Sequence, residues 1–398
     1  MLSEIQSIIE NQGTSIEAWF AEKFKQYPPF IYNSVDLRYS GHKITAVDTN
    51  IFPAGFNNLS AAARDASALE LKKYLHKDIA KILLITEFHT RNLKYLENIS
   101  TLKKIIENTG REVFLASFNP EFTQAINIED ALGQELTIYP LERKNDSIIT
   151  INGYEPDLII FNNDLTSGSP EILKNIKQEI IPPTGMGWYR RTKYEHFQKY
   201  NHIASEFAKE FNFDPFFITT ELGFCKKVNF KERKGLECIA LETEKTLQRI
   251  NEKYKQHNIT SEPYVYIKAN QGTYGMGIMT AKNADDVFAV NKKTRNKMNS
   301  LKSKKLNEQI LIQEGIETID NYQGAPCEPF IYLINGKATG SILRINANKD
   351  AQTNLNSTGA EFIAADNLKD FSTKLPTYAV IAQLAALAAK MEEYQNEE

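Results

Sequence analysis

Between residues 43 and 180, short apolar runs alternate with longer stretches that have helical spacing. The apolar runs occupy residues 44–47, 82–85, 113–117 and 158–161, and the helical stretches occupy residues 58–76, 90–109 and 169–180. A strand that is followed by a helix and then by another strand folds into a parallel β-α-β unit. The alternation therefore predicts an α/β fold whose N-terminal part is a Rossmann-like parallel sheet.

Polar residues follow three of the four apolar runs. They are Asp48 and Asn50 after the first run, Glu87, His89 and Arg91 after the second, and Asn163 after the fourth. In open α/β sheets, ligands bind at the edge formed by the carboxyl ends of the strands. Each cluster alone fits a turn or a helix cap equally well. Three clusters at one edge together predict a binding site.

A Pro- and Gly-rich segment at residues 182–193 predicts a domain boundary. We expect an N-terminal α/β substrate-recognition domain at residues 1–185 and a second region at residues 186–398. Further predicted elements are an amphipathic helix at 1–26, a helix at 193–211, a strand at 309–313, a hairpin at 330–345 and a closing helix at 377–394.

A lysine and a glycine-rich loop follow the apolar run at residues 264–267. Lys268 is followed by a loop that contains Gly272, Thr273, Tyr274, Gly275 and Gly277. Glycines let backbone N–H groups approach phosphate oxygens, and the lysine adds positive charge. No Gly-Lys-Ser/Thr closes the loop, so it is not a P-loop. A lysine ahead of the glycines is the order found in ATP-grasp enzymes. The alternative is a glycine-rich hairpin with a solvated lysine.

Further residues of the second half fit nucleotide chemistry. In an ATP-grasp enzyme the strand at 310–316 would lie along the adenine, with Gln313 and Glu314 near the hinge between the two lobes. The alternative is a strand that simply runs into a turn. Arg344 ends the second hairpin strand and could neutralise charge on a phosphoryl group. Because Mg²⁺ prefers oxygen ligands, the candidate metal ligands are Glu328, Asn356 and Glu361.

Composition excludes several classes of protein. The net charge of −3 argues against a nucleic-acid binder, since phosphate binding needs clustered positive charge. No apolar stretch is long enough for a membrane span, and the N-terminus does not look like a signal peptide. Cys225, Cys238 and Cys327 are widely spaced, which favours reduced thiols and a cytoplasmic location.

Two long motifs, at residues 47–59 and 268–278, resemble those of the ATP-grasp-type glutamate–cysteine ligases of certain proteobacteria. The segments 87–92, 162–165 and 187–196 are similar as well, so the resemblance spans nearly the whole chain. The strand ending in Arg344 and the segment Asn-Leu-Asn-Ser-Thr-Gly at 354–359 also resemble bacterial glutathione synthetase. One departure is that no Glu-x-Asn metal pair follows Glu361.

The resemblance implies an ATP-grasp architecture in which residues 186–398 form the nucleotide-binding and catalytic region. It implies ATP and Mg²⁺ as cofactors and the joining of the glutamate γ-carboxyl to the cysteine amine through an acyl phosphate, the first step of glutathione synthesis. Lys268 and Arg344 would be catalytic. The alternatives are another ATP-grasp ligase, such as glutathione synthetase, and a non-catalytic amino-acid- or nucleotide-binding protein. The sequence leaves a homo-oligomer open.

For the amino-acid substrates, guanidinium groups are the expected partners of carboxylates. Arg38 and Arg91 are assigned that role, and Asp48 or Glu87 would hold an α-ammonium group. The remaining candidates would orient polar groups or bind phosphate or carboxylate, and they are Asn50, Asn57, Asn58, His89, Asn163, Arg190 and Arg191. A surface salt bridge is the alternative for any single arginine.

Overall fold

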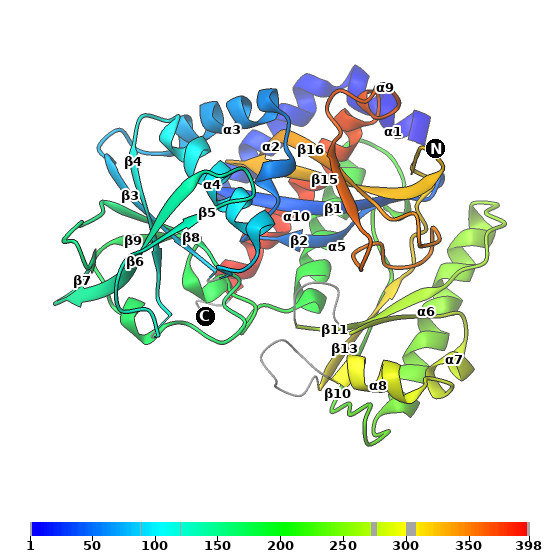
Figure 1. Cartoon of the computed structure of the whole chain (residues 1–398). Helices are drawn as coiled ribbons and strands as arrows, with labels where there is room; N and C mark the ends of the chain where they lie inside the picture. Colours follow the sequence, from blue (N-terminus) through cyan, green and yellow to red (C-terminus); the bar gives the residue numbers. More distant parts are fainter. Residues whose placement is uncertain (1, 88, 120, 272–276, 300–307, 396–398) are drawn as a thin grey trace.

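The computed structural model describes residues 2–87, 89–119, 121–271, 277–299 and 308–395, which form three sheets with helices packed around them (Figure 1). The expected α/β class is confirmed. Two of the sheets are antiparallel, and the third is largely parallel. Gly272, Thr273, Tyr274 and Gly275 lie outside the described residues.

The largely parallel sheet has seven strands in the order β5-β6-β4-β3-β8-β9, with β7 paired to β6. Its strands are β3 (Lys81–Thr86), β4 (Glu112–Ser117), β5 (Ile126–Glu129), β6 (Glu135–Lys144), β7 (Ser147–Thr150), β8 (Leu158–Asn162) and β9 (Glu179–Ile181). The helix α4 (Leu93–Glu107) packs on one face, and α3 (Ala61–Tyr74) packs against α4. Three of the predicted strands and two of the three predicted helices are therefore confirmed here.

The expected helix at residues 169–180 is wrong. That segment forms a short 3₁₀ turn, η2 (Glu171–Leu173), followed by the edge strand β9. Gly168 and Pro170 interrupt a helix at its start, and Ile180 pairs in parallel with Ile159 of β8. Pairing with a neighbouring strand thus decides a conformation that local periodicity does not.

The central sheet is antiparallel and joins the two ends of the chain. Its order is β17-β16-β15-β1-β2, with β14 paired to β15. Its strands are β1 (Tyr32–Tyr39), β2 (Ile44–Asn50), β14 (Asn321–Tyr322), β15 (Ala325–Ile334), β16 (Lys337–Ile345) and β17 (Glu361–Ala364). The predicted hairpin is confirmed as β15 and β16. The run at residues 44–47 was expected in the parallel sheet, which is wrong, because β2 pairs antiparallel with β1.

Helices cover one face of the central sheet. They are α1 (Leu2–Asn11), α2 (Gly13–Gln26), α5 (Lys193–Glu210), α9 (Lys369–Ser372) and α10 (Leu375–Gln395). Apolar residues on alternate positions of the sheet, such as Val35 and Leu37 of β1, pack against Ile381 of α10 and its neighbours. On the opposite face, α3 packs against β15 and β16, and polar side chains such as Ser34 and Asp36 line a cavity. Because β1 pairs with β15, the central sheet crosses the expected boundary at residue 185, and that division stays a prediction.

The third sheet forms a small lobe with the order β10-β13-β11-β12. It contains β10 (Leu222–Lys226), β11 (Val265–Ala269), β12 (Ile278–Ala281) and β13 (Gln309–Glu314), with α6 (Leu236–Gln256), α7 (Ala284–Phe288) and α8 (Lys292–Asn299). Figure 1 shows it below and to the right of the central sheet. Three further 3₁₀ turns are η1 (Phe56–Asn58), η3 (Thr184–Met186) and η4 (Pro215–Phe217).

A disulfide in this lobe corrects the expectation of reduced thiols. Cys225 of β10 and Cys238 of α6 are bonded, with their Cα atoms 6.2 Å apart. The strand and the helix pack side by side, which the spacing of the two cysteines along the chain does not reveal. Cys327 is a free, buried thiol.

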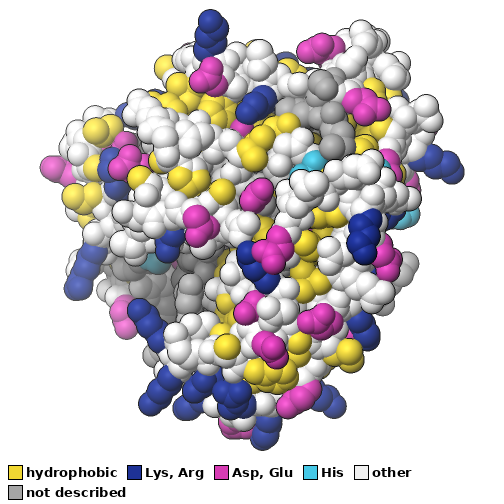
Figure 2. Space-filling model, turned by 90° about the vertical axis from the view of Figure 1, so that its right-hand side faces the viewer, with side chains coloured by type: hydrophobic (Ala, Val, Ile, Leu, Met, Phe, Trp, Pro, Cys, Tyr) yellow, Lys and Arg dark blue, Asp and Glu magenta, His cyan; other side chains and the backbone are white. Residues whose placement is uncertain are grey.

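Charged side chains of both signs are distributed over the surface. Figure 2 shows positive and negative side chains interspersed over most of one face of the molecule. Within the described residues, no helix is both long and apolar enough to cross a membrane.

Candidate functional site

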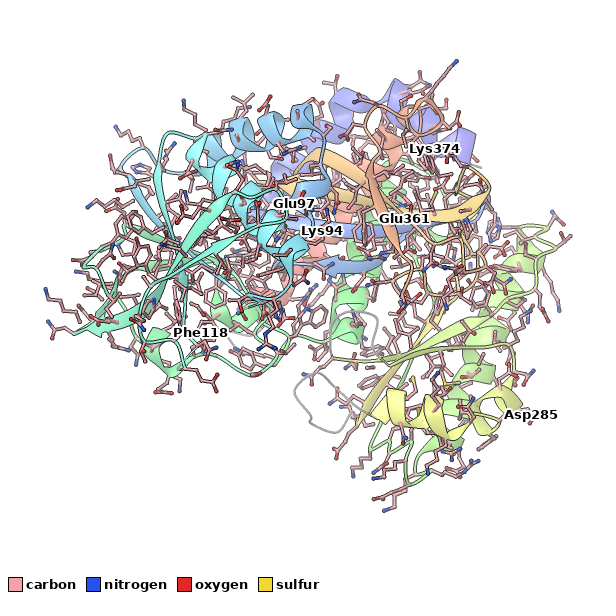
Figure 3. All side chains as sticks on the ribbon, viewed as in Figure 1. Lys94, Glu97, Phe118, Asp285, Glu361 and Lys374 are labelled. Carbon is pink, nitrogen blue, oxygen red and sulfur yellow. A yellow bond between two sulfur atoms is a disulfide. The ribbon has the colours of Figure 1, made fainter. Side chains whose placement is uncertain are left out.

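A cavity of about 1340 Å³ lies between the parallel sheet and the central sheet. Its wall includes the loop after β2, the segment after β3, the start of α4 and the face of the central sheet that is opposite α10. Lys94 of α4 and Glu361 of β17 line it from two separate elements (Figure 3). The volume exceeds the usual range for one small ligand, so it has room for two amino acids.

The floor of the large cavity is formed by alternating residues of neighbouring strands. Ser34 and Asp36 come from β1, Asp48 and Asn50 from β2, and Arg344 from β16. Alternate side chains of a strand point to the same face, so the sequence that packs Val35 and Leu37 on α10 also presents Ser34 and Asp36 to the cavity. Asp36 and Asp48 are direct partners across the two strands.

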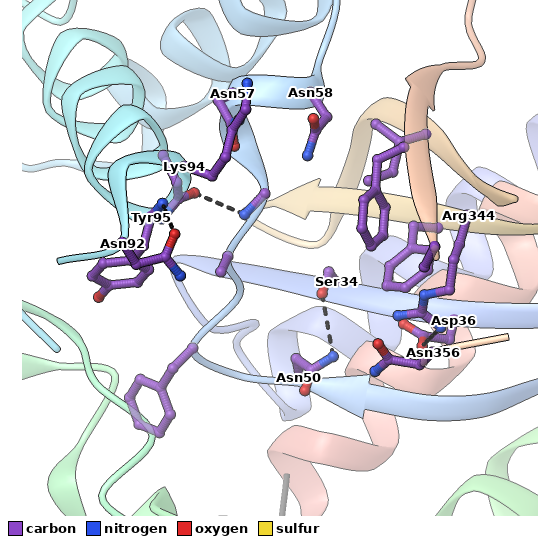
Figure 4. A pocket seen from close by; sticks show the side chains of 18 of the residues that line it. Ser34, Asp36, Asn50, Asn57, Asn58, Asn92, Lys94, Tyr95, Arg344 and Asn356 are labelled. Atoms are coloured by element: carbon purple, nitrogen blue, oxygen red, sulfur yellow. Dashed lines mark hydrogen bonds and ion pairs between the residues drawn. The ribbon is translucent and has the colours of Figure 1, made fainter. Parts of the chain in front are cut away.

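A second cavity of about 60 Å³ adjoins the first, and both are lined by Asp36, Asp48, Arg344 and Asn356 (Figure 4). Lys268 of β11 lines the smaller one, as do Ala269 and Ile278, which are close to the two ends of the glycine-rich loop. Gly277 at the returning end has a φ of 64°, a conformation that favours glycine. The loop thus starts and ends beside the point where the cavities meet.

Lys268 is held in a buried position. Its Nζ donates to the Gln313 side-chain oxygen at 2.7 Å and to the Val47 carbonyl at 3.2 Å. Burial lowers the pKa of Lys268 to about 7, although the charge of Asp48 acts in the opposite direction. A lysine that is easily deprotonated gains most from an anionic ligand, because the added negative charge restores its proton.

Asp48 is neutralised by a second lysine. Lys193 Nζ, at the start of α5, lies 2.6 Å from Asp48 Oδ1 and 4.4 Å from the centre of the Trp188 ring. Burial acts to raise the pKa of Asp48, but the attraction of Lys193 and Lys268 lowers it to about 2. Asp48 therefore stays ionised.

Two arginines share a buried carboxylate beside these lysines. Arg38 Nε donates to Glu328 Oε2 at 2.8 Å, and Arg344 Nη1 donates to Glu328 Oε1 and, at 3.1 Å, to Asp36 Oδ2. Burial would raise the pKa of Glu328, but the two guanidinium groups lower it below its ordinary value. The floor thus carries a dense set of opposite charges out of contact with bulk water.

The structure brings together about half of the predicted site residues. Those that line one or both cavities are Arg38, Asp48, Asn50, Asn57, Asn58, His89, Arg91, Lys268, Glu328, Arg344, Asn356 and Glu361. Those that line neither cavity are Glu87, Asn163, Arg190, Arg191, Gly277, Gln313 and Glu314. Asp48 and Asn50 were expected beyond a parallel strand, and they instead belong to β2 itself.

Several of the residues outside the cavities hold the structure together. Glu314 pairs with the buried Lys43 at 2.7 Å, and the Asn163 side-chain oxygen accepts from the Leu165 N–H. Glu392 of α10 accepts two hydrogen bonds from Arg191 and contacts His196 of α5. These contacts join α10 to the start of α5, where Lys193 lies. Arg191 therefore helps to hold Lys193 in position and does not line a cavity itself.

Comparison with known proteins agrees with this geometry. The family model described as glutamate-cysteine ligase matches residues 6–393. A crystal structure from Methylobacillus flagellatus KT, provisionally named a gamma-glutamylcysteine synthetase, shares 33% identity with this chain. The alignment covers 99% of this chain and 96% of that one, with a TM-score of 0.89. The chain belongs to the glutamate–cysteine ligase family. It is therefore an ATP-dependent ligase.

Two weaker similarities carry no weight in this assignment. A D-alanyl-alanine synthetase A from Vibrio cholerae O1 biovar eltor str. N16961 shares 12% identity, covers 77% of this chain and 80% of its own, and has a TM-score of 0.35. A glutathione synthetase-like effector (GSS30) from Globodera pallida shares 10% identity. The alignment covers 91% of this chain and 80% of that one, with a TM-score of 0.38. Among curated protein sequences, none matches this chain.

Glu328, one of the three expected magnesium ligands of the ligase, does not fit a metal in this arrangement. Both oxygens of Glu328 accept hydrogen bonds from arginines. Among the described residues, no three His, Cys, Asp or Glu side chains are grouped to hold a metal ion.

The ligase site also contains residues that sequence reasoning missed. They are Ser34, Asp36, Lys94, Tyr95, Trp188 and Lys193. For Ser34 and Asp36 a signal exists, because polar and apolar residues alternate from Ser34 to Arg38 as in a half-buried strand. For Lys193 and Trp188 the contacts form only when distant segments meet.

Asn98 of α4 shapes the wall of the ligase cavity. Its buried side-chain oxygen accepts from the N–H groups of Gly55 at 2.8 Å and Phe56 at 2.9 Å, just before Asn57 and Asn58. We expect Asn98→Ala to cost about 1–3 kcal/mol of stability, because two N–H groups lose their acceptor, and to raise the KM for the amino-acid substrates. Urea unfolding and steady-state kinetics measure the two effects. Asn98→Asp keeps the accepting oxygen and should lose less; equal effects of the two changes would contradict this role.

Proposed function

We propose that the protein joins the γ-carboxyl of glutamate to the amine of cysteine, with ATP converted to ADP and phosphate through a γ-glutamyl phosphate. The observation that carries this proposal is the contact between the two cavities. Lys268 and Arg344 face the smaller one, and a cavity with room for two amino acids opens directly from it. ATP would enter as its magnesium complex, so that the ion is part of the substrate.

The first step transfers the γ-phosphoryl group of ATP to the glutamate γ-carboxylate. Transfer of this kind depends mainly on position and on neutralising charge. Lys268 and Arg344 would supply the positive charge from opposite walls, one from the small lobe and one from the central sheet. The backbone of the glycine-rich loop would hold the remaining phosphates. Arg38, enclosed by Glu328 and by the carbonyls of Ile316 and Thr353, would hold Glu328 in place and not bind substrate.

The second step requires the cysteine amine to displace phosphate from the acyl phosphate. Enclosure between two sheets would protect that intermediate from water. Arg91 lines the large cavity and would bind an α-carboxylate, and Asn57 and Asn58 would orient polar groups. Asp48 would act through Lys193, because its Oδ1 is already paired with that lysine.

Product analysis tests the proposal. Purified protein with ATP, Mg²⁺, glutamate and cysteine should form γ-glutamylcysteine, ADP and phosphate, and each should depend on both amino acids. A parallel reaction supplies γ-glutamylcysteine and glycine. Phosphate release in the second reaction only would assign the protein to glutathione synthesis instead. Binding of the amino acids without ATP turnover in either reaction would make it a binding protein.

A further inference from the structure

Asp36 has an unused acceptor oxygen at the meeting point of the two cavities. Its side chain is only 5% exposed, and its Oδ2 accepts from Arg344 at 3.1 Å. Its Oδ1 is buried and has no hydrogen-bond partner among the described residues. A buried polar atom without a partner costs free energy. A ligand that donates a hydrogen to this oxygen would remove that cost.

The position of Asp36 indicates which ligand group would meet it. It lines both cavities and touches Arg344, and in Figure 4 it lies beside Arg344 and Asn356. In the proposed function Arg344 neutralises the phosphoryl group that becomes the leaving group, so the amine that attacks the acyl phosphate must approach this end of the cavity. The glutamate ammonium is several bonds away from the reacting γ-carboxyl and would lie farther off.

We propose that Asp36 is a catalytic residue that binds the ammonium group of the amine substrate and accepts its proton before the amine attacks. This inference rests on the proposed function and names the base that it needs. The balance is complete with groups at the site. The ammonium gives one proton to Asp36, the nitrogen lone pair forms the C–N bond as the C–O bond to phosphate breaks, and the second proton leaves with phosphate as HPO₄²⁻. Asp36 then returns its proton to solvent.

The charges around Asp36 suit a base that works near neutral pH. Burial raises the pKa of Asp36 to about 7, because Arg344 only partly offsets it and the negative charges of Asp48 and Glu328 add to it. The groups that face it are Asp48 on β2, Glu328 and Tyr332 on β15, Arg344 on β16, and, across the smaller cavity, Lys193 and Lys268. A general base is most effective when its pKa lies near the working pH.

The other carboxylates of the floor are poorer acceptors. Asp48 is paired with Lys193, and its low pKa makes it a weak base. Both oxygens of Glu328 accept from arginines, and its pKa is lowered. Among the described carboxylates of this floor, Asp36 therefore combines an available oxygen with a raised pKa.

Replacement of the amine tests the assignment. Hydroxylamine is already neutral at neutral pH and traps an acyl phosphate as a hydroxamate, so it does not need a base. With Asp36→Asn, we expect kcat/KM for cysteine to fall about 10²–10⁴-fold, while hydroxamate formation from glutamate, ATP and hydroxylamine stays close to wild type. In wild type, kcat/KM for cysteine should fall as the pH drops below about 7, because Asp36 becomes protonated, and this acid limb should vanish in Asp36→Asn.

Each outcome decides a separate point. Cysteine ligation that survives in Asp36→Asn overturns the role of Asp36, and so does an equal loss with both amines in folded protein, because that pattern indicates a structural role. If Asp36→Asn does not accumulate as folded protein, Asp36→Glu gives the same comparison with the carboxylate kept but displaced. A wild-type protein that forms no hydroxamate overturns the proposed function itself. Asp366→Asn is the control. It removes a carboxylate that accepts a hydrogen bond from Ser341 outside both cavities, and it should leave both reactions unchanged.

Discussion

Replacing Lys268 by methionine is expected to lower kcat/KM for ATP by about 100- to 1000-fold, the effect of removing one well-placed charge at a reacting oxyanion. Methionine fills a similar volume, so the fold should be retained. The ε-ammonium group is buried at the smaller cavity next to both ends of the glycine-rich loop. Phosphate release that depends on ATP and glutamate measures the loss, and circular dichroism checks the fold.

The pH dependence of ATP use gives a second measurement on Lys268. Burial lowers its pKa to about 7 in the free protein, against the charge of Asp48 and with help from Lys193 and Arg38. A lysine must be protonated to attract phosphate, so kcat/KM for ATP should fall as the pH rises above about 7. Lys268→Arg keeps its charge over this range, and it should therefore remove the alkaline fall. For ATP the fall is expected at alkaline pH and reports on Lys268. For cysteine the fall is expected at acid pH and reports on Asp36, so the pH profiles measured with the two substrates distinguish the two residues.

Full ATP use by Lys268→Met would contradict this placement of the phosphates. Lys282→Met is a suitable control, because that lysine lies on the outer side of the small lobe and pairs with Glu262. Its replacement removes one positive charge from the same lobe and should leave ATP use unchanged.

The parts of the fold that could be predicted from the sequence are those with strong local periodicity. The strands β3, β4 and β8 are continuous apolar runs, and α3, α4, α5 and α10 have helical spacing over several turns. The strand β1 was missed, because its apolar residues alternate with polar ones that face a cavity. The sheet to which β2 belongs could not be foreseen either, because its partner β1 pairs in turn with β15, almost 300 residues along the chain.

The residues of the candidate site also divide into those with a local sequence signal and those that depend on distant segments. Motifs that are contiguous in sequence, such as Asn57 and Asn58 or Lys268, could be found directly and do line the cavities. The role of a residue whose partner comes from a distant segment of the chain could not be found in this way. Arg38 and Arg191 were expected to meet substrate carboxylates or phosphate, but the carboxylates they meet are Glu328 and Glu392. A guanidinium group seen in sequence does not show whether the protein or the substrate supplies its partner.

Replacing Arg344 by methionine is expected to lower kcat by about 10³-fold or more, as for arginines that neutralise a phosphoryl group in transfer. The same change leaves Asp36 without its buried partner and Glu328 with Arg38 alone, so stability should also fall by about 3–5 kcal/mol. Arg344→Lys separates the two effects. A lysine restores the positive charge and most of the stability, but its single ammonium group cannot contact two carboxylates and a phosphoryl oxygen in the planar geometry of a guanidinium.

We therefore expect Arg344→Lys to have a melting temperature close to that of wild type, unlike Arg344→Met, while its turnover stays strongly impaired. The Nε atom of Arg344 is buried without an acceptor among the described residues, which leaves it available to a ligand oxygen. Glu328→Gln is the matched control on the other side of the pair, since it weakens the hold on Arg344 without removing its charge, and a smaller loss of turnover should follow. Wild-type turnover by Arg344→Lys would show that this arginine serves the fold alone, and the charge that stabilises the transferring phosphoryl group would then have to come from Lys268 and the loop beyond it.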